Sequence, residues 1–87
     1  MKLFKYTAEH ISRMQAIKLV REFEAQDVDV GYADMDPAVS NQFILVAAVS
    51  SSLAGSIRAR IWEENSGARC DMMEITQDQL NCLINKG

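Results

Sequence analysis

The side chains of this sequence that most readily serve as nucleophiles or metal ligands are two cysteines and one histidine. Cys70 and Cys82 lie twelve positions apart, and His10 is far from both along the chain. A structural zinc site needs four cysteine or histidine ligands in two close pairs. A cysteine nucleophile needs a neighbouring base and a third group that orients that base. The spacing supplies neither arrangement, so we expect no catalytic residue, no metal, no cofactor, and two free, mostly buried thiols.

An acidic segment between residues 27 and 36 suggests a second kind of chemistry. A calcium loop of the EF-hand type places glycine at its sixth position and glutamate at its twelfth. Counted from the first aspartate of the segment, those positions hold Tyr32 and Ala38, so the register excludes that kind of loop. We interpret the segment as a solvated acidic loop and as a candidate docking surface for a basic partner protein. Its acidic residues are Asp27, Asp29, Asp34 and Asp36.

A second candidate surface contains two arginines and the single tryptophan. Alternation of apolar and polar residues over 56–64 predicts a strand, which places Arg58, Arg60 and Trp62 on one face. Tryptophan and arginine are enriched at the energetic centres of protein interfaces. The alternative is that a helix covers this face, so that Trp62 belongs to the core and the arginines extend to its rim. RNA binding is a weaker interpretation, because acidic residues lie nearby and the net charge is −3.

The elements that must position these residues are predicted from the apolar pattern. A strand is expected over 2–6, followed by a helix over 8–25 that Thr7 caps and whose apolar side chains form one stripe. Residues 26–37 form a connection that Pro37 ends. The segments 42–50, 56–64 and 70–75 predict strands, with a turn at 51–55. Thr76 then caps a helix over 76–86.

The expected architecture is α+β, an antiparallel sheet of three or four strands with the helices 8–25 and 76–86 packed on it. An all-α fold is the alternative, because apolar residues keep helical spacing between Val39 and Ile61. The serines at 50–52 and Gly55 argue against it, since serine and glycine are poor residues for a helix interior.

Length and composition restrict the function further. The 87 residues fit a single domain over 1–87, and 48% hydrophobic against 24% charged residues is typical of a folded protein. The net charge gives no general attraction to nucleic acid or to anionic membranes. The longest apolar run is too short to span a bilayer, and residues 1–10 lack the apolar segment of a signal peptide. We therefore expect a cytoplasmic protein.

Two apolar segments carry a resemblance to a known family. Asn41-Gln-Phe-Ile-Leu-Val-Ala-Ala-Val and Ala54-Gly-Ser-Ile-Arg-Ala-Arg-Ile are similar to the second and third strands of GNAT-type N-acetyltransferases. The order of predicted elements resembles the N-terminal half of that family. The resemblance implies a glycine-bearing acetyl-CoA loop after Ile75. Residues 76–80 (Thr-Gln-Asp-Gln-Leu) contain no glycine and no basic residue, so that motif is absent.

Two further resemblances concern the order of elements and short fragments. Helix, three strands and helix is the order of double-stranded RNA-binding domains, although the lysines that begin their last helix are missing from 76–83. The fragments Met1-Lys-Leu-Phe-Lys-Tyr, Ile57-Arg-Ala-Arg-Ile, Gly67-Ala-Arg and Gln77-Asp-Gln-Leu resemble those of a family of small phage anti-CRISPR proteins, in the same order but at different spacings.

These observations predict a small protein-binding module without enzymatic activity, a regulatory or inhibitory accessory protein of the phage or plasmid type. The expected partner-binding residues are those of both surfaces: Arg58, Arg60, Trp62, Asp27, Asp29, Asp34 and Asp36. A homodimer formed through the sheet face or an open strand edge is also expected. The alternatives are a degenerate GNAT-like acetyltransferase fragment or subunit, and an RNA-binding domain.

Overall fold

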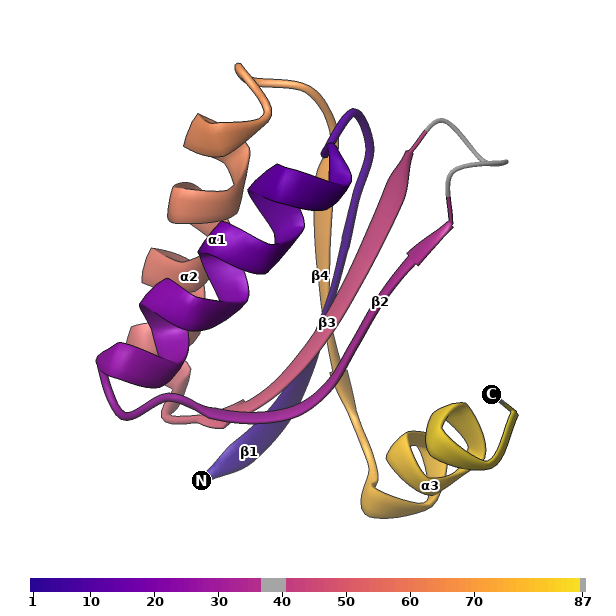
Figure 1. Ribbon diagram of the computed structural model, residues 1–87. Coiled ribbons are helices and arrows are strands. Elements are labelled where there is room, and N and C mark those ends of the chain that lie inside the picture. The colour runs from indigo at the N-terminus through magenta and orange to yellow at the C-terminus, as the bar shows by residue number, and fades with distance from the viewer. Residues whose placement is uncertain (37–40, 87) are drawn as a thin grey trace.

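Four strands form one antiparallel sheet in this computed structural model, which describes residues 1–36 and 41–86 (Figure 1). The strands are β1 (Lys2–Ala8), β2 (Asp29–Asp36), β3 (Gln42–Val49) and β4 (Cys70–Ile75), and the helices are α1 (Arg13–Ala25), α2 (Ser51–Glu64) and α3 (Gln77–Lys86). Helices α1 and α2 cover one face of the sheet, and α3 lies against the other face near one end. The α+β prediction is confirmed, and the all-α alternative is wrong.

The strand order is β2-β3-β1-β4, so β2 and β4 are the two edges of the sheet. Each neighbouring pair is antiparallel, and β3 lies between β1 and β2. The chain order β1-α1-β2-β3-α2-β4 is the split βαβ arrangement of ferredoxin-like folds. Helix α3 is an addition to that arrangement.

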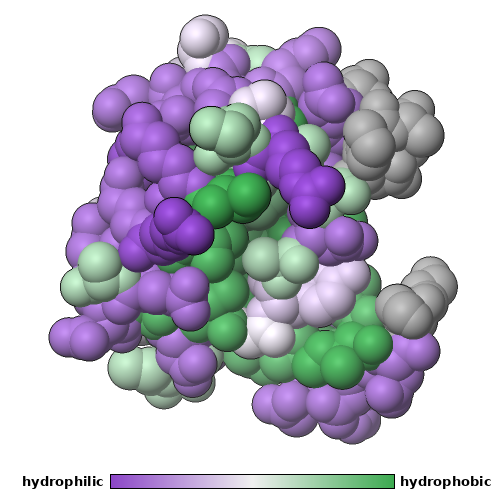
Figure 2. Space-filling model, in the orientation of Figure 1, coloured by the Kyte–Doolittle hydropathy of each residue, from purple (hydrophilic) through white to green (hydrophobic). Residues whose placement is uncertain are grey.

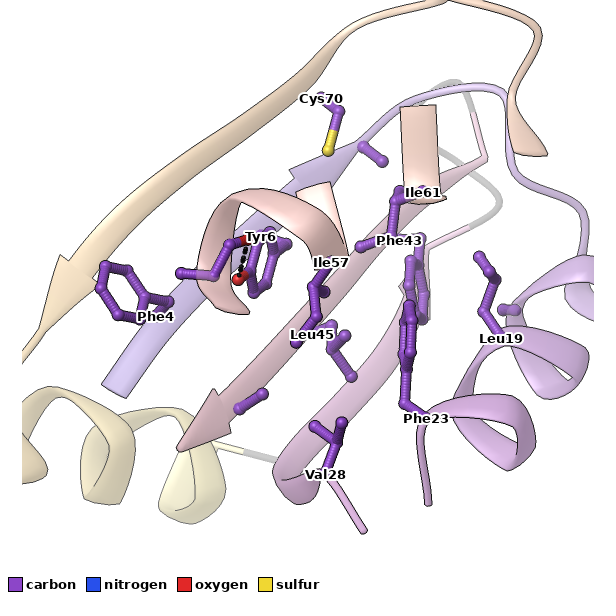
Figure 3. Packing of buried hydrophobic residues seen from close by; sticks show 14 of the residues in the cluster. Phe4, Tyr6, Leu19, Phe23, Val28, Phe43, Leu45, Ile57, Ile61 and Cys70 are labelled. Carbon is purple, nitrogen blue, oxygen red and sulfur yellow. Dashed lines mark hydrogen bonds between the residues drawn. The ribbon is translucent and has the colours of Figure 1, made fainter. Parts of the chain in front are cut away.

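The main core lies between the sheet and the pair α1 and α2 (Figure 3). Alternate residues of β1 and β3 point into it, because successive side chains of a strand point to opposite faces. Tyr6 is fully buried there, and its hydroxyl donates a hydrogen bond of 2.7 Å to the carbonyl oxygen of Ala54 in α2. The largest fully buried side chains around it are Phe23, Phe43, Ile11, Leu19, Leu45 and Ile61.

The boundary between β1 and α1 differs from the prediction. Thr7 does not cap a helix, because it lies in β1 opposite Ile44. Helix α1 begins at Arg13, where the Ser12 hydroxyl accepts from the Gln15 backbone N–H at 3.2 Å and the Gln15 side chain accepts from the Ser12 N–H at 2.9 Å. This reciprocal capping box satisfies two backbone donors and outweighs the single cap predicted at Thr7.

The predicted connection over 26–37 contains an edge strand, β2. Val30 and Met35 of this strand pack against the main core, although they are five residues apart, because a register shift between Val30 and Tyr32 brings them to the same face; Val28 just before the strand is buried. The many aspartates and this register shift concealed the strand. The role predicted for Pro37 lies outside the described residues.

The predicted turn at 51–55 and strand over 56–64 are wrong, because both belong to helix α2. Ser50 caps this helix by accepting from the Leu53 N–H at 3.3 Å, so the serine run begins a helix and does not interrupt one. Ala54, Ile57 and Ile61 point into the core at helical spacing. The helical spacing that suggested an all-α fold therefore predicts α2 correctly. It is wrong for residues 42–49, which form strand β3.

The C-terminal predictions are confirmed. Strand β4 spans Cys70–Ile75, and the Thr76 hydroxyl accepts from the Gln79 N–H at 3.2 Å at the start of α3. Leu80 of α3 packs with Val46 and Ile75 in a second, smaller core on the other face of the sheet. Among the described residues, no helix is both long and apolar enough to cross a membrane.

Candidate protein-binding surfaces

The three residues predicted to share one strand face are separated by helix α2. Residues at i and i+2 of a helix point in different directions, whereas residues at i and i+4 share a side. Arg58 and Trp62 are therefore neighbours, and Arg60 points away from both. The placement of all three on one face is wrong, because it depended on a strand over 56–64. Trp62 is 51% exposed, so it is not a core residue.

Arg60 joins the two helices that cover the sheet. Its guanidinium donates to both carboxylate oxygens of Glu22 in α1, at 2.8 and 3.0 Å, and to Glu64 in α2 at 2.9 Å. The hydrogen bonds to Glu22 and Glu64 raise the pKa of Arg60. The hydrogen bond from Arg60 lowers the pKa of Glu64. Arg60 is thus engaged within the fold.

Arg58 and Trp62 lie beside the β4 edge of the sheet. The Arg58 Nε donates to the carbonyl oxygen of Cys70, the first residue of β4, at 2.9 Å. On the same strand, Met72 and Met73 are 39% and 54% exposed. The sequence pattern places these methionines in a strand but does not mark them as surface residues. Their exposure follows from the place of β4 at the edge of the sheet, which no local signal in the sequence shows.

The four predicted acidic residues line the opposite edge of the sheet. Asp27 has a positive φ of 62° just before β2, and Asp29 and Asp36 are the first and last residues of that strand. The Asp34 carboxylate accepts from the Met35 N–H at 2.8 Å and from the Tyr32 hydroxyl at 3.3 Å. Asp29, Asp34 and Asp36 therefore belong to an edge strand and Asp27 to the turn before it, so the predicted acidic loop is wrong for residues 29–36.

A groove of about 630 Å³ runs between α1 and β2. Figure 2 shows it as a hydrophobic strip with strongly hydrophilic side chains on both sides. Its apolar lining includes Ala16, Ile17, Val20, Met35 and Phe43.

Two arginines line the rim of this groove. Arg13, Ile17 and Arg21 follow one another at intervals of four residues, which aligns them along one side of α1. Ile17 is 44% exposed between the two arginines. Among the described residues, no salt bridge involves Arg13 or Arg21. Glu24 and Asp34 also line the groove.

A second hollow, of about 660 Å³, lies where α3 meets the sheet. Lys5, Met73 and Ile75 line it from the strands, and Asp78 and Leu83 line it from the helix. The arrangement places a lysine and an aspartate beside an apolar surface.

The two thiols differ in their exposure to solvent. Cys70 is buried, as predicted, but Cys82 is exposed, so the prediction of two buried thiols is wrong for Cys82. Burial raises the pKa of the Cys70 thiol to about 11, so the thiol stays protonated at neutral pH and is a poor nucleophile. Within residues 1–36 and 41–86, no group of three or more side chains is arranged to hold a metal ion.

The two surfaces with exposed apolar side chains beside arginines are thus the α1–β2 groove and the β4 edge. Comparison with known proteins adds no family assignment: no protein-family model matches the chain, and no curated protein matches its sequence.

Proposed function

We propose that this chain is a small protein-binding module that acts without catalysis, as a regulatory or inhibitory accessory protein. The observation that carries the proposal is the exposure of Ile17 between Arg13 and Arg21 on the rim of an apolar groove. An exposed apolar groove flanked by arginines is the composition that protein interfaces concentrate at their centres. Two side chains capable of chemistry are engaged within the fold, because the Tyr6 hydroxyl is hydrogen-bonded in the core and Cys70 is buried.

The charges at the groove define the partner segment that it favours. Arg13 and Arg21 attract carboxylates, and Ile17 between them favours an apolar side chain at the centre of the contact. Glu24 and Asp34 line the same groove and repel a uniformly acidic ligand. The preferred ligand is therefore an amphipathic segment of another protein, with an apolar residue between two acidic residues.

A peptide selection on the purified protein tests this proposal. The protein would be exposed to a display library of random peptides of about 16 residues, and enriched sequences would be synthesised. We expect enriched peptides that combine apolar and acidic residues, and Ile17→Glu should weaken their binding by about tenfold or more. Added salt should weaken the same binding, because its charged contacts are exposed.

Leu53→Glu is the matched control for that experiment. Leu53 is 43% exposed on α2, almost the same as Ile17 on α1, and a glutamate near the start of a helix is well tolerated. This variant should bind the peptides as the wild type does. Enriched peptides that bind Ile17→Glu and the wild type equally well would show that the groove is not the binding site.

A further inference from the structure

We infer that two copies of this chain pair through their β4 strands and so join two four-stranded sheets into one. This surface lies at the opposite edge of the sheet from the α1–β2 groove, because the strand order is β2-β3-β1-β4. The inference is therefore independent of the proposed function, and a dimer of this kind leaves both grooves exposed.

The outer edge of β4 has backbone groups directed away from the sheet. The Glu9 N–H donates to the Arg69 carbonyl oxygen at 3.1 Å, just beyond the end of the β1–β4 pairing. In an antiparallel ladder such hydrogen-bonded pairs alternate with pairs whose backbone groups point outward. Cys70, Met72 and Glu74 are therefore the outward residues of β4. The position of Arg58 agrees, because its side chain reaches the Cys70 carbonyl from outside the sheet.

The two edges of the sheet differ in how well they resist strand addition. On β2, a register shift follows Val30, and the Asp34 side chain already occupies the Met35 N–H. Bulges and charged side chains of this kind protect an edge from pairing with another chain. On β4, the register with β1 is unbroken, and Met72 and Met73 are exposed, one on each face. Arg58 donates to the outward carbonyl oxygen of Cys70, but a carbonyl oxygen has a second lone pair and can also accept from another strand, whereas the Met35 N–H has only one proton. The β4 edge is therefore the one suited to pairing.

The sequence of β4 is complementary to itself in one antiparallel register. With the two-fold axis at Met72, three outward residues pair: Met72 lies opposite Met72 of the second copy, and Cys70 lies opposite its Glu74. A shift by two residues in either direction loses one of these three pairs. Asp71 then faces Met73 of the second copy, so no like charges lie directly opposite each other.

Side chains on the helix-covered face add to this complementarity. Because Arg58 is anchored at Cys70, it lies next to the position that Glu74 of the second copy would occupy. The symmetry creates this pair of opposite charges twice.

Analytical ultracentrifugation over about 1 to 200 µM tests the inference, because a dimer of this size dissociates on dilution. We expect the wild type to shift from monomer to dimer in this range. Arg58→Glu and Glu74→Arg should each raise the dimer dissociation constant by about tenfold or more, and the double variant should restore it to within about threefold. Circular dichroism would establish that each variant is folded.

Met72→Pro provides a second test that does not depend on charge. Its backbone N–H points away from β1, and proline is tolerated at such edge positions. The variant should therefore stay folded and monomeric across the concentration range. The inference is overturned by a wild type that remains monomeric throughout, or by Met72→Pro dimerising as the wild type does. Loss of the dimer in Ile17→Glu, with retention in Met72→Pro, would instead place self-association at the groove.

Discussion

Arg60 of α2 holds Glu22 of α1 through two hydrogen bonds, of 2.8 Å from Nε and 3.0 Å from Nη2. The third guanidinium nitrogen of Arg60, Nη1, donates to Glu64 at 2.9 Å. Lys18 Nζ of α1 lies 3.6 Å from the Glu64 carboxylate. The side chains of Arg60 and Glu64 are 24% and 13% exposed, so water screens their interaction only in part. The guanidinium therefore fixes how the two helices lie together on the sheet.

Removal of this guanidinium should destabilise the fold. We expect Arg60→Ala to lower the free energy of unfolding by about 1–3 kcal/mol, because it leaves the part-buried carboxylate of Glu22 without its cation and removes the closer of the two cations at Glu64. Arg60→Lys should recover part of the loss, since lysine keeps the charge but not the two-pronged geometry. Urea denaturation measures both variants.

The matched control for Arg60→Ala is Arg69→Ala. Arg69 also contacts a carboxylate at 2.8 Å, but the two side chains are 69% and 58% exposed. Its loss should cost less than about 0.5 kcal/mol. Equal effects of the two substitutions would contradict the structural role of Arg60.

Because the pKa of Glu64 is lowered, the stabilisation by this carboxylate is present above its ordinary pKa of 4.5 and is lost as pH falls through the folded value.

The buried hydroxyl of Tyr6 predicts a loss of stability at alkaline pH. Burial raises the pKa of Tyr6 to about 12, from 10.0 in an exposed tyrosine. The unfolded chain therefore releases this proton at lower pH than the folded protein does. The stabilisation is complete below pH 10.0 and is lost progressively as pH rises toward about 12.

Tyr6→Phe separates this effect from other alkaline titrations. At pH 7 it should cost about 1 kcal/mol, because the Ala54 carbonyl loses the hydroxyl as a hydrogen-bond donor. Above pH 10.0 the difference between wild type and variant should shrink and can reverse in sign. Free energies of unfolding measured in urea at several pH values give this comparison. A constant difference over the whole range would mean that Tyr6 titrates normally.

The sequence predicted the elements whose local signals agree with each other. β3 is a continuous apolar run, and α3 begins with a threonine cap whose hydroxyl accepts from Gln79. At both places propensity, pattern and capping favour the same structure. At α2 they conflict, because Ile57 and Ile61 fit both one face of a strand and one side of a helix. Ala54 and Ser50 decide for the helix, one as a buried residue and the other as the cap.

The candidate surfaces were less predictable than the elements, because they depend on which segments become neighbours. Nothing local shows that Arg13 and Ile17 face β2, since that strand was itself hidden among aspartates. Arg60 and Trp62 could not be separated while residues 56–64 were interpreted as a strand. The exposure of Met72 follows from the position of β4 at the sheet edge, which only the strand order establishes.

Asn65 provides a test of how the end of α2 is attached to the sheet. The side chain is 5% exposed, and its Nδ2 donates at 3.1 Å to the carbonyl oxygens of both Glu9 and Arg69. It thereby joins the end of α2 to the segments that follow β1 and precede β4. Asn65→Ala should lower the free energy of unfolding by about 1–3 kcal/mol, because the carbonyl oxygens of Glu9 and Arg69 both lose the amide donor at a part-buried position.

Asn65→Asp should be more destabilising than Asn65→Ala at pH 7. Aspartate is nearly the same size as asparagine, but its charged carboxylate takes the place of the donating amide and faces two carbonyl oxygens. Burial and these oxygens would raise the pKa of the new carboxyl, so its protonated form is favoured in the folded state. The gap between the two variants in urea denaturation should therefore narrow as pH falls from 7 toward the ordinary aspartate value of about 3.9. Equal stability of the two variants at pH 7 would show that the amide protons of Asn65 do not hold these segments together.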